Sequence, residues 1–420
     1  MRELRITDLK VATVQANFEW TFVRVYAGDL YGTGEAGPAP GLRGMSQHFR
    51  RLLLGEDALK IRRIEQKIRW ATLYAGTSTY HLASAINIAL YDLVGKYLNV
   101  PVWRILGGYR DEVRVYVDAH GGKGLEAMNS LLLPEKLPWL TSTEVESGRL
   151  VTENNPIHGR LSIEKWNSDY SPESYADRAR RMVAEGYTAI KFDLDVPTPY
   201  TDPRLIMSGE LSLKDIDYLA SIVRAVREAV GDGVDIMFDL HWRYSVNTAV
   251  RICKAIEQYR PRWIEDPTPA QITISNLDEL RLITQNCTIP IETGENLYTV
   301  YQFKDLLNTG VRVWAPDIVK AGGVSEGVRI AELASMYDIE YSPHNISSPI
   351  GTMAHAHVAS VANTFGVLEF HGHDVPFWGE VVKPKRRVIE KGYIRLTDEP
   401  GLGVDLDMDV VKRYWPDVEL

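Results

Sequence analysis

Cysteine is almost absent from this chain of 420 residues. The two cysteines, Cys253 and Cys287, form no CxxC pair and have no histidine at metal-ligand spacing, so they indicate neither a zinc site nor a disulfide framework. The sequence also lacks an apolar run of ~18 residues, the length that a membrane-spanning helix needs. Its N-terminus alternates charged and apolar residues, unlike the continuous apolar core of a signal peptide. We therefore expect a soluble, cytoplasmic protein.

Positive charge is also in the minority, because 47 lysines and arginines face 56 aspartates and glutamates, which gives a formal net charge of −9. An anionic chain is a poor partner for nucleic acid or an anionic membrane, so we expect neither. With 45% hydrophobic residues the chain can bury a large core. Its length favours two or three domains, or one barrel of ~250 residues with an additional domain.

The first 112 residues combine strand and helix patterns. Strand-like stretches with glycine-rich turns come first, at 3–15, 20–29 and 31–37. Helical patterns follow at 58–74 and 83–98. We expect an α+β domain here.

From residue 113 onward, short apolar stretches alternate with helical patterns. The stretches have polar ends and lie at 113–122, 189–196, 235–242, 262–268, 289–296, 313–320, 339–345 and 367–373. Strands that alternate with helices form a parallel sheet, and eight of them predict a closed TIM-like barrel, (β/α)7β, over residues 113–375. The carboxylates and histidines stand at the strand ends, where such barrels have their active sites.

One segment interrupts this alternation, at 123–170. It contains Pro134, Pro138 and Pro156 and has no clear periodicity. A connection of that length is usually functional or disordered. Since it leaves the C-terminal end of the first barrel strand, we expect either a lid over the barrel mouth or an insertion that serves only the surface or an oligomer contact.

Three carboxylates, Asp239, Glu265 and Glu295, end three consecutive strands. Consecutive barrel strands are neighbours, so these anions can converge, and they would repel one another unless a cation lay among them. Oxygen ligands alone favour Mg²⁺. Each residue could instead be an ordinary solvated carboxylate, although three successive strand ends make that less favoured. Glu292 is a competing third ligand, which regular strand geometry places on the opposite face from Glu295.

Other titratable groups stand at the same strand ends. Lys191 and Asp193 share one face of their strand, and His241 shares the face of Asp239, while Asp317, His344 and Glu369 end the last three strands. Hydrogen bonding to Asp317 would orient the His344 ring and raise its basicity, which predicts His344 as a general base. His355 and His357, in a following helix, have no evident partner, so we expect a packing or surface role for both.

Together these motifs resemble the enolase superfamily, and within it the mandelate racemase subgroup. They are INIALYDLVGKYLNVPVWRILGG near the N-terminus, IKFD, FDLHW, WIEDP and TGEN at strand ends, and APDIVKAGGVSEG and SPHNISSPIG further on. The resemblance implies a capping domain at 1–112 and a C-terminal segment, 376–420, that returns to it. It implies Mg²⁺, or Mn²⁺, at Asp239, Glu265 and Glu295. Lys191 and Glu369 would then stabilise the enolate that forms when the proton α to a metal-bound carboxylate is removed.

Two positions refine the expected activity. Racemases of the subgroup have Lys-x-Lys on the second strand, whereas this chain has Asp193 in the second place, which disfavours a base on that face of the substrate. In the acid-sugar dehydratases, the strand-three Asp ligand is followed two residues later by a His that protonates the departing hydroxyl. Asp239-Leu240-His241 matches that pattern. Since strands three and seven face each other across a barrel, His241 and His344 would perform an anti elimination.

The resemblance therefore implies a Mg-dependent hydro-lyase that converts an aldonate, such as galactonate, gluconate or xylonate, to its 2-keto-3-deoxy acid. The alternatives are a racemase, an epimerase or a cycloisomerase on the same scaffold, or a relative without enzymatic activity. Lys191, Asp193 and the cap residues Phe18 and Trp20 are the expected substrate contacts. We also expect a homo-oligomer.

Overall fold

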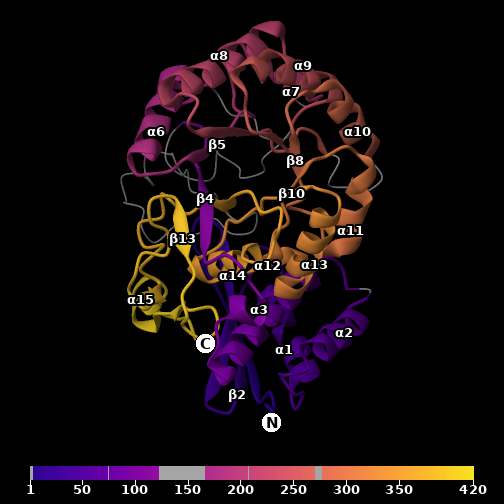
Figure 1. Ribbon diagram of the computed structural model, residues 1–420, viewed down its shortest axis with the longest axis vertical. Helices are drawn as coiled ribbons and strands as arrows, with labels where there is room; N and C mark the ends of the chain where they lie inside the picture. Colours follow the sequence, from indigo (N-terminus) through magenta and orange to yellow (C-terminus); the bar gives the residue numbers. More distant parts are fainter. Residues whose placement is uncertain (1–2, 74, 123–165, 207, 270–276) are drawn as a thin grey trace.

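The computed structural model describes residues 3–73, 75–122, 166–206, 208–269 and 277–420. Figure 1 shows the N-terminal elements at one end of the molecule, the barrel at the other end, and the C-terminal segment beside their junction. The predicted insertion at 123–170 lies outside the described residues except for its last five, 166–170. In the described part of the chain, no helix has the length and apolar character to cross a membrane.

The N-terminal elements form a cap. Its antiparallel sheet has the order β1 (Asp8–Gln15), β2 (Glu19–Ala27), β3 (Leu30–Ala36). Helices α1 (Leu42–Leu53), α2 (Ile61–Ala71) and α3 (Ser78–Leu98) follow. Helix α3 lies directly on β3, because Cβ atoms at Gly32 and Gly34 would come within 2.0 Å of the Ala89 and Ala85 carbonyl oxygens. The glycines of the GTGEAG stretch therefore permit this close approach.

Eight parallel strands form the barrel, as predicted. They are β4 (Glu112–Asp118), β5 (Ala189–Asp193), β6 (Asp235–Asp239), β7 (Ile264–Glu265), β8 (Ile291–Thr293), β9 (Val313–Trp314), β10 (Glu340–Tyr341) and β11 (Leu368–Phe370). They pair in sequence order, and β11 pairs with β4. Backbone hydrogen bonds from Tyr341 to Thr364 and from Glu369 to Pro343 join β10 to the β11 segment and close the ring.

Helices connect the strands and cover the outside of the barrel. The longer ones are α6 (Pro172–Ala184), α8 (Leu213–Val230), α9 (Val246–Ile256), α10 (Leu277–Asn286), α11 (Thr299–Asp305), α13 (Gly323–Met336) and α14 (Pro349–Ala359). Short helices are α4 (Val102–Ile105), η1 (Ser168–Tyr170), α7 (Pro203–Ile206), η2 (Glu257–Tyr259), η5 (Leu306–Asn308), α12 (Ile318–Ala321) and α15 (Met408–Tyr414). This alternation confirms the predicted (β/α)7β, TIM-like barrel with an N-terminal α+β cap.

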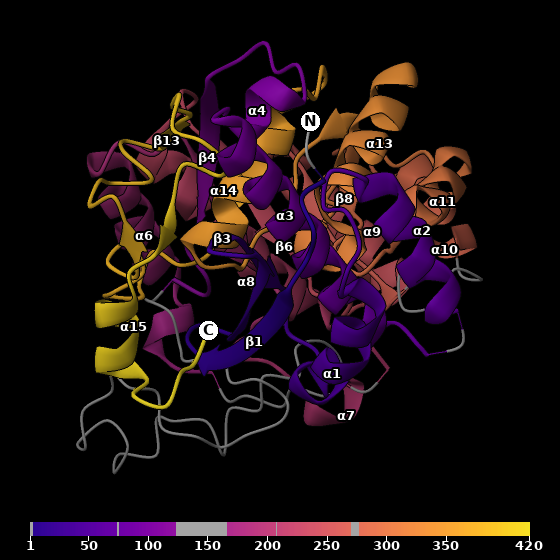
Figure 2. The same cartoon turned by 90° about the horizontal axis from the view of Figure 1, so that it is seen from below.

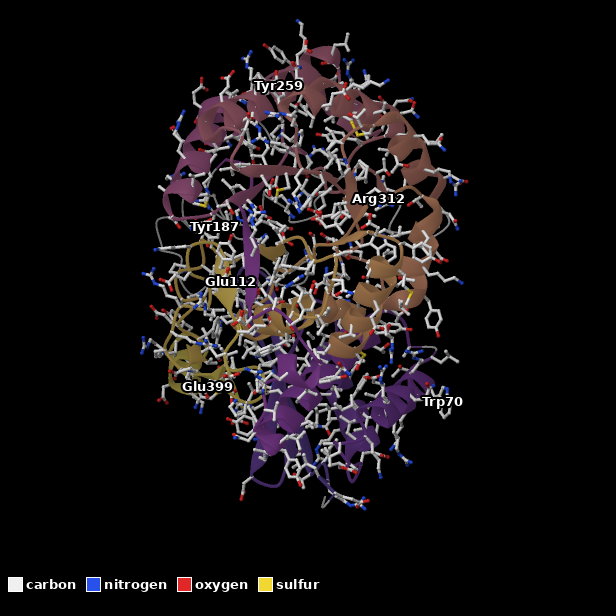
Figure 3. The ribbon with its side chains drawn as sticks, viewed as in Figure 1. Trp70, Glu112, Tyr187, Tyr259, Arg312 and Glu399 are labelled. Carbon is white, nitrogen blue, oxygen red and sulfur yellow. A yellow bond between two sulfur atoms is a disulfide. The ribbon has the colours of Figure 1, made fainter. Side chains whose placement is uncertain are left out.

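Serine caps begin several of these helices. Ser212 accepts a hydrogen bond from the backbone of Asp215, whose carboxylate accepts one from the Ser212 backbone, so the two residues form a capping box on α8. Ser171 caps α6, and Pro172 occupies its first turn. Side chains fill the space between the strands and these helices (Figure 3). A separate buried cluster, which includes Tyr116 of β4 and Trp263 beside β7, fills the space between facing strands inside the barrel.

Cap and barrel meet through α3, which packs against α12 and α13 (Figure 1). Figure 2 shows α3 from below, near the middle of the molecule. The C-terminal segment joins the two parts through β12 (Val382–Lys383), β13 (Tyr393–Arg395) and β14 (Asp405–Leu406). Strand β13 pairs with β4 of the barrel, and Asp405 lies 3.4 Å from both Arg24 and Lys96 of the cap. These contacts hold the cap close to the barrel end, although the domain bounds themselves stay a prediction.

The expectation that the cysteines indicate no disulfide is wrong. Cys253 of α9 and Cys287, which directly follows α10, are bonded, with their Cα atoms 5.8 Å apart. Local spacing could not predict this pair, because it depends on two successive barrel helices packing side by side.

Candidate active site

Lys191 lies at the centre of the carboxylates at the strand ends. Its Nζ is 3.2 Å from Asp239 Oδ2 on β6, 2.8 Å from Glu265 Oε2 on β7 and 2.7 Å from Glu369 Oε1 on β11. All four side chains are buried. Burial lowers the pKa of Lys191, but the surrounding carboxylates, Glu265 first, raise it well above its usual value. The ammonium therefore stays charged and holds anions from three strands together.

The carboxylates fit a divalent cation. Glu265, Asp266 and Glu295 place one oxygen each within 4.8 Å of one another. Glu265 Oε1 is buried and has no hydrogen-bond partner among the described residues, which is costly for a carboxylate unless a cation binds it. Burial and the Asp239 charge raise the pKa of Glu265 well above its usual value, and a bound cation would reverse that effect.

The two competing third ligands lie in different places. Glu295 follows β8 and belongs to the oxygen group with Glu265. Glu292 lies within β8, paired in register with Glu265, and is fully buried but does not belong to that group. Asp239 also lies outside the group of Glu265, Asp266 and Glu295. It is linked to Glu265 by the Lys191 ammonium, which contacts both carboxylates.

His344, after β10, is oriented by Asp317. Its Nδ1–H donates to Asp317 Oδ2 at 2.9 Å, and its Nε2 lies 3.3 Å from Glu295 Oε2. Burial lowers the pKa of His344, but the Glu295 carboxylate and the other acids around the ring raise it above its usual value. The imidazole is thus a basic group whose second nitrogen faces the candidate metal ligand.

Asp317 has partners that the sequence did not predict. Its Oδ1 accepts hydrogen bonds from the Val319 backbone at 3.1 Å and from His355 Nε2 at 3.2 Å, and Lys320 Nζ lies 3.5 Å from Oδ2. Although burial raises the pKa of Asp317, Lys320 and the hydrogen bonds from both histidines lower it well below its usual range. The expectation that His355 lies on the surface is wrong, because its side chain is fully buried. The alternative of a packing role holds, and Asp317 is its partner.

His241 follows β6 in a left-handed turn, with φ of 38° there and 57° at Trp242. Its backbone N–H donates to Asp239 Oδ1 at 2.8 Å, its Nδ1 lies 3.1 Å from Asp195 Oδ1, and its Nε2 lies 3.5 Å from Asp239 Oδ2. Burial lowers the pKa of His241, but Asp239 and Asp195 raise it well above its usual value. The ring is therefore held between two carboxylates that favour its charged form.

Asp195 is the partner that the sequence analysis missed. It follows Asp193 at the period of two that already placed Lys191 and Asp193 on one face, so the same signal could have found it. Asp193 itself is held at its backbone, where its carbonyl accepts from the Tyr175 hydroxyl at 2.8 Å. Its Oδ1 is buried without a hydrogen-bond partner among the described residues, and burial raises its pKa well above the usual value.

The two predicted cap contacts differ in their surroundings. Phe18 is partly exposed, and its ring centre lies 5.2 Å from that of His371, at the end of β11. Trp20 is 1% exposed and packs edge-on against Phe377 and Trp415, so its ring belongs to the core between the cap and the C-terminal segment. Only Phe18 of the two faces the strand ends directly.

A capped parallel barrel with carboxylates, a lysine and two histidines at the ends of its strands defines a class of barrel proteins with a candidate metal-dependent active site. Residues 2–107 match the mandelate racemase / muconate lactonizing enzyme N-terminal domain, and residues 174–410 match the enolase C-terminal domain-like family. The chain belongs to the mandelate racemase / muconate lactonizing enzyme family of the enolase superfamily.

Relatives with named activities are similar over most of the chain. D-xylonate dehydratase of Haloferax volcanii is 36% identical over 99% of this chain and 90% of its own length. D-mannonate dehydratase of a Sphingomonas species is 28% identical over 88% of this chain and 83% of its own length. Among solved structures, a mandelate racemase/muconate lactonizing enzyme-like protein from Rubrobacter xylanophilus is 34% identical, with a TM-score of 0.83 over 98% of both chains.

Proposed function

We propose that the protein is a hydro-lyase that converts a sugar acid of the aldonate type to its 2-keto-3-deoxy acid with the help of Mg²⁺. The observation that carries the proposal is the placement of two histidines on opposite sides of a carboxylate-lined site. His241 follows β6 and His344 follows β10, four strands away around the barrel. A pair so placed is suited to remove a proton from one face of a substrate and to protonate a leaving group on the other.

Asp239, Glu265 and Glu295 would hold the cation. Bound there, Mg²⁺ supplies a Lewis acid for the substrate carboxylate and makes the α proton more acidic. Lys191 contributes a positive charge beside the metal-ligand carboxylates, and its Nζ lies 2.7 Å from Glu369 Oε1. Charge that develops on the substrate carboxylate would therefore meet a preorganised cationic environment.

His344 would be the base. Asp317 holds its Nδ1–H, so Nε2 is the nitrogen that takes the C2 proton. His241 would be the acid, since Asp195 and Asp239 flank its ring and keep it protonated. Transfer of that proton to the 3-hydroxyl releases water, and the enol product rearranges to the 2-keto acid. Proton and hydroxyl leave from opposite faces.

The class of substrate rests on the relatives. One is named for D-xylonate at 36% identity, and another for D-mannonate. We therefore propose xylonate first, with gluconate and galactonate as six-carbon alternatives that share its configuration at C2 and C3. A racemase, epimerase or cycloisomerase would not need His241 as an acid, and Asp193 replaces the second lysine that a two-faced racemase uses.

The test is a screen of aldonic and aldaric acids with Mg²⁺, in which 2-keto-3-deoxy products are detected by their semicarbazones. Formation of such a product from at least one aldonate supports the proposal. Exchange or inversion at C2 without loss of water contradicts it and favours an epimerase. Assembly as a homo-oligomer stays a prediction that sedimentation velocity checks.

A further inference from the structure

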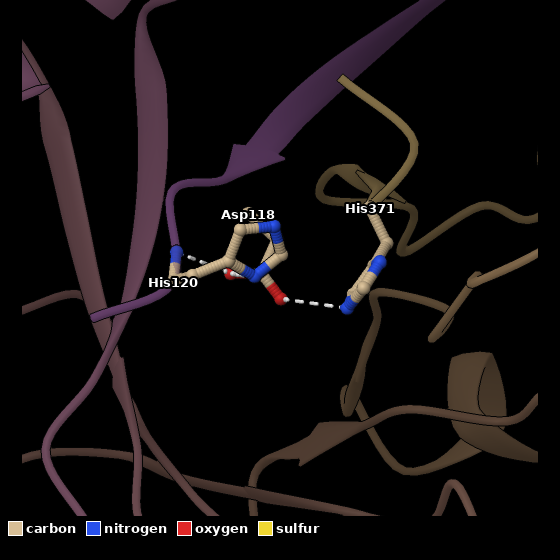
Figure 4. A group of neighbouring side chains, drawn as sticks. All are labelled: Asp118, His120 and His371. Atoms are coloured by element: carbon tan, nitrogen blue, oxygen red, sulfur yellow. Dashed lines mark hydrogen bonds and ion pairs between the residues drawn. The ribbon is translucent and has the colours of Figure 1, made fainter. Parts of the chain in front are cut away.

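A second polar cluster lies across the barrel from the candidate metal ligands. Asp118 ends β4 and His371 follows β11, two strands that pair with each other, and His120 comes two residues after Asp118. Strands β4 and β11 face β7 and β8 around the ring. All three side chains are at least nine-tenths buried. Figure 4 shows the His120 ring over the Asp118 carboxylate and the His371 ring beside them.

The cap fixes the proton on the His371 ring. The Trp20 indole N–H donates to Asn17 Oδ1 at 2.9 Å, so the other end of the Asn17 amide is its NH₂ group. That NH₂ donates to the Ile346 carbonyl at 3.1 Å and to His371 Nδ1, also at 3.1 Å. Since Nδ1 accepts, the neutral ring carries its proton on Nε2. Trp20, although buried, thereby acts through Asn17 to fix His371 Nε2–H as a hydrogen-bond donor at the strand ends.

His371 Nε2–H faces Asp118 across a gap. The nitrogen lies 4.0 Å from Asp118 Oδ2, too far for a direct hydrogen bond. An oxygen placed about 2.8 Å from both atoms would meet them at roughly a right angle and could accept from His371 while it donates to Asp118. A hydroxyl group has that combination of donor and acceptor.

His120 adds another polar atom to the cluster. Its backbone N–H donates to Asp118 Oδ1 at 2.9 Å, and its Nδ1 lies 3.3 Å from the same oxygen. Its Nε2 is buried and has no hydrogen-bond partner among the described residues. A buried ring nitrogen without a protein partner can form a hydrogen bond with a ligand that enters the cluster. The His120 and His371 rings are 4.6 Å apart, so both border the same space.

A transition metal is the competing occupant, because two histidines and a carboxylate are a common ligand set. The Asn17 contact opposes it: a metal on His371 Nε2 would displace the proton to Nδ1, which would then meet the Asn17 NH₂ donor. The donor pattern therefore fits an uncharged hydroxyl better than a cation.

We propose that Asp118 and His371, with His120 beside them, bind a hydroxyl of the substrate at C4 or beyond. This subsite rests on the proposed function, in which the metal ligands on β6 to β8 bind the substrate's carboxylate. Asp118 Oδ2 lies 4.0 Å from Lys191 Nζ, so the cluster adjoins the reacting end of the site. A chain that extends from the metal side across the barrel mouth reaches β4 and β11. We call this subsite the hydroxyl clamp. Because it binds a hydroxyl beyond C3, the enzyme should prefer polyhydroxy acids to short ones that lack such a hydroxyl.

The experiment compares two substrates in four proteins. D-Xylonate carries hydroxyls beyond C3, whereas D-glycerate has none, and both can lose water between C2 and C3. In His371→Phe, kcat/KM for xylonate should fall ~10-fold or more, because the buried substrate hydroxyl loses the N–H donor of His371. The value of kcat/KM for glycerate, which has no such hydroxyl, should change less than ~3-fold. His371→Gln keeps an N–H donor and should recover part of the loss. Where glycerate turns over too slowly, its inhibition constant replaces kcat/KM.

His373→Gln is the matched control. His373 lies two residues further on, but its ring turns outward to Glu185 and Asp374, at 2.7 and 3.2 Å. Its substitution should leave the ratio of the two substrates unchanged. Equal losses for xylonate and glycerate in His371→Phe would overturn the subsite while the proposed function stands. Failure of the unsubstituted protein to convert any aldonate would overturn the proposed function and the hydroxyl clamp with it.

A second readout tests the cluster without turnover. Nitrogen NMR of histidine-labelled protein, assigned with His371→Gln, should show a protonated Nε2 and an unprotonated Nδ1 for His371. Titration with Zn²⁺ in the presence of excess Mg²⁺ should leave those signals in place. A protonated Nδ1, or Zn²⁺ binding that depends on His371, would overturn the proposal in favour of a metal site.

Discussion

Asp317 holds two histidines with one carboxylate: its Oδ2 accepts from His344 Nδ1 at 2.9 Å and its Oδ1 from His355 Nε2 at 3.2 Å. Only His344 also reaches the candidate metal ligand Glu295, at 3.3 Å. The second histidine thus fixes the carboxylate that orients the first. The proposed base at the β10 end is therefore part of a buried, hydrogen-bonded group of three side chains.

The carboxylate should orient the ring more than it binds substrate. In Asp317→Asn, we expect kcat to fall ~10²–10⁴-fold with a small change in KM, because the amide can favour the wrong tautomer of His344. Steady-state kinetics on the aldonate identified by the screen checks this. A large rise in KM at constant kcat would show instead that Asp317 acts on substrate binding.

The metal site predicts different results for two glutamates close together on the chain. Glu295→Gln should weaken Mg²⁺ binding at least ~10-fold, since a charged oxygen ligand is lost from the group with Glu265. Glu292→Gln should change it less than ~3-fold, because Glu292 lies outside that group. Calorimetric titration of chelator-treated protein measures both, and the reverse order would make Glu292 the third ligand.

Buried neutral histidines predict a loss of stability in acid. His357 accepts from the Trp103 backbone at 3.0 Å and donates to the Leu402 carbonyl at 3.1 Å, and burial lowers its pKa to about 4. Burial likewise lowers the pKa of His81 to about 4. Below pH 6.5 the unfolded chain binds more protons than the folded one, so the free energy of unfolding falls as pH drops towards 4.

Each of these histidines should cost about 2 kcal/mol of stability between pH 7.5 and pH 5. Urea unfolding at the two pH values measures the loss. His357→Gln, which cannot titrate, should show a smaller difference between them whatever its absolute stability. An equal difference in the variant and the unsubstituted protein would mean that His357 contributes nothing to the pH dependence.

The disulfide predicts the number of thiols. Cys253 and Cys287 are the two cysteines of the chain and are bonded to each other. Denatured, non-reduced protein should therefore show no reactive thiol, and reduction should release two per chain. Cys287→Ser should lower the free energy of unfolding by ~2–4 kcal/mol, because the unfolded chain regains the entropy of an open loop. Two thiols before reduction would contradict the bond.

Much of the fold and of the candidate site follows from local signals. The alternation of strand and helix predicts the barrel, and a carboxylate at the end of each of three strands predicts where anions gather, since parallel strands end at one rim. The period of two within a strand places Lys191 and Asp193 on one face. These inferences need only the neighbourhood of each residue along the chain.

Other features depend on contacts between distant segments. The stretches that contain His120 and His371 were both recognised as strand ends, but their meeting requires β11 to return beside β4. The sequence predicts Trp20 of the cap as a substrate contact. In the folded protein its ring packs in the core, and its indole acts through Asn17. Neither relation has a local signature.

The central claim, that His344 and His241 act on opposite faces in two separate steps, is tested most directly by hydrogen exchange in D₂O. His344→Asn should lose both dehydration and incorporation of deuterium at C2, because the imidazole that takes the C2 proton is removed. His241→Asn should lose dehydration by ~10²–10⁴-fold, yet still exchange the C2 hydrogen, because the enolate forms and returns. Proton NMR of the recovered aldonate measures the exchange. Dehydration at the unsubstituted rate in His241→Asn would contradict the account.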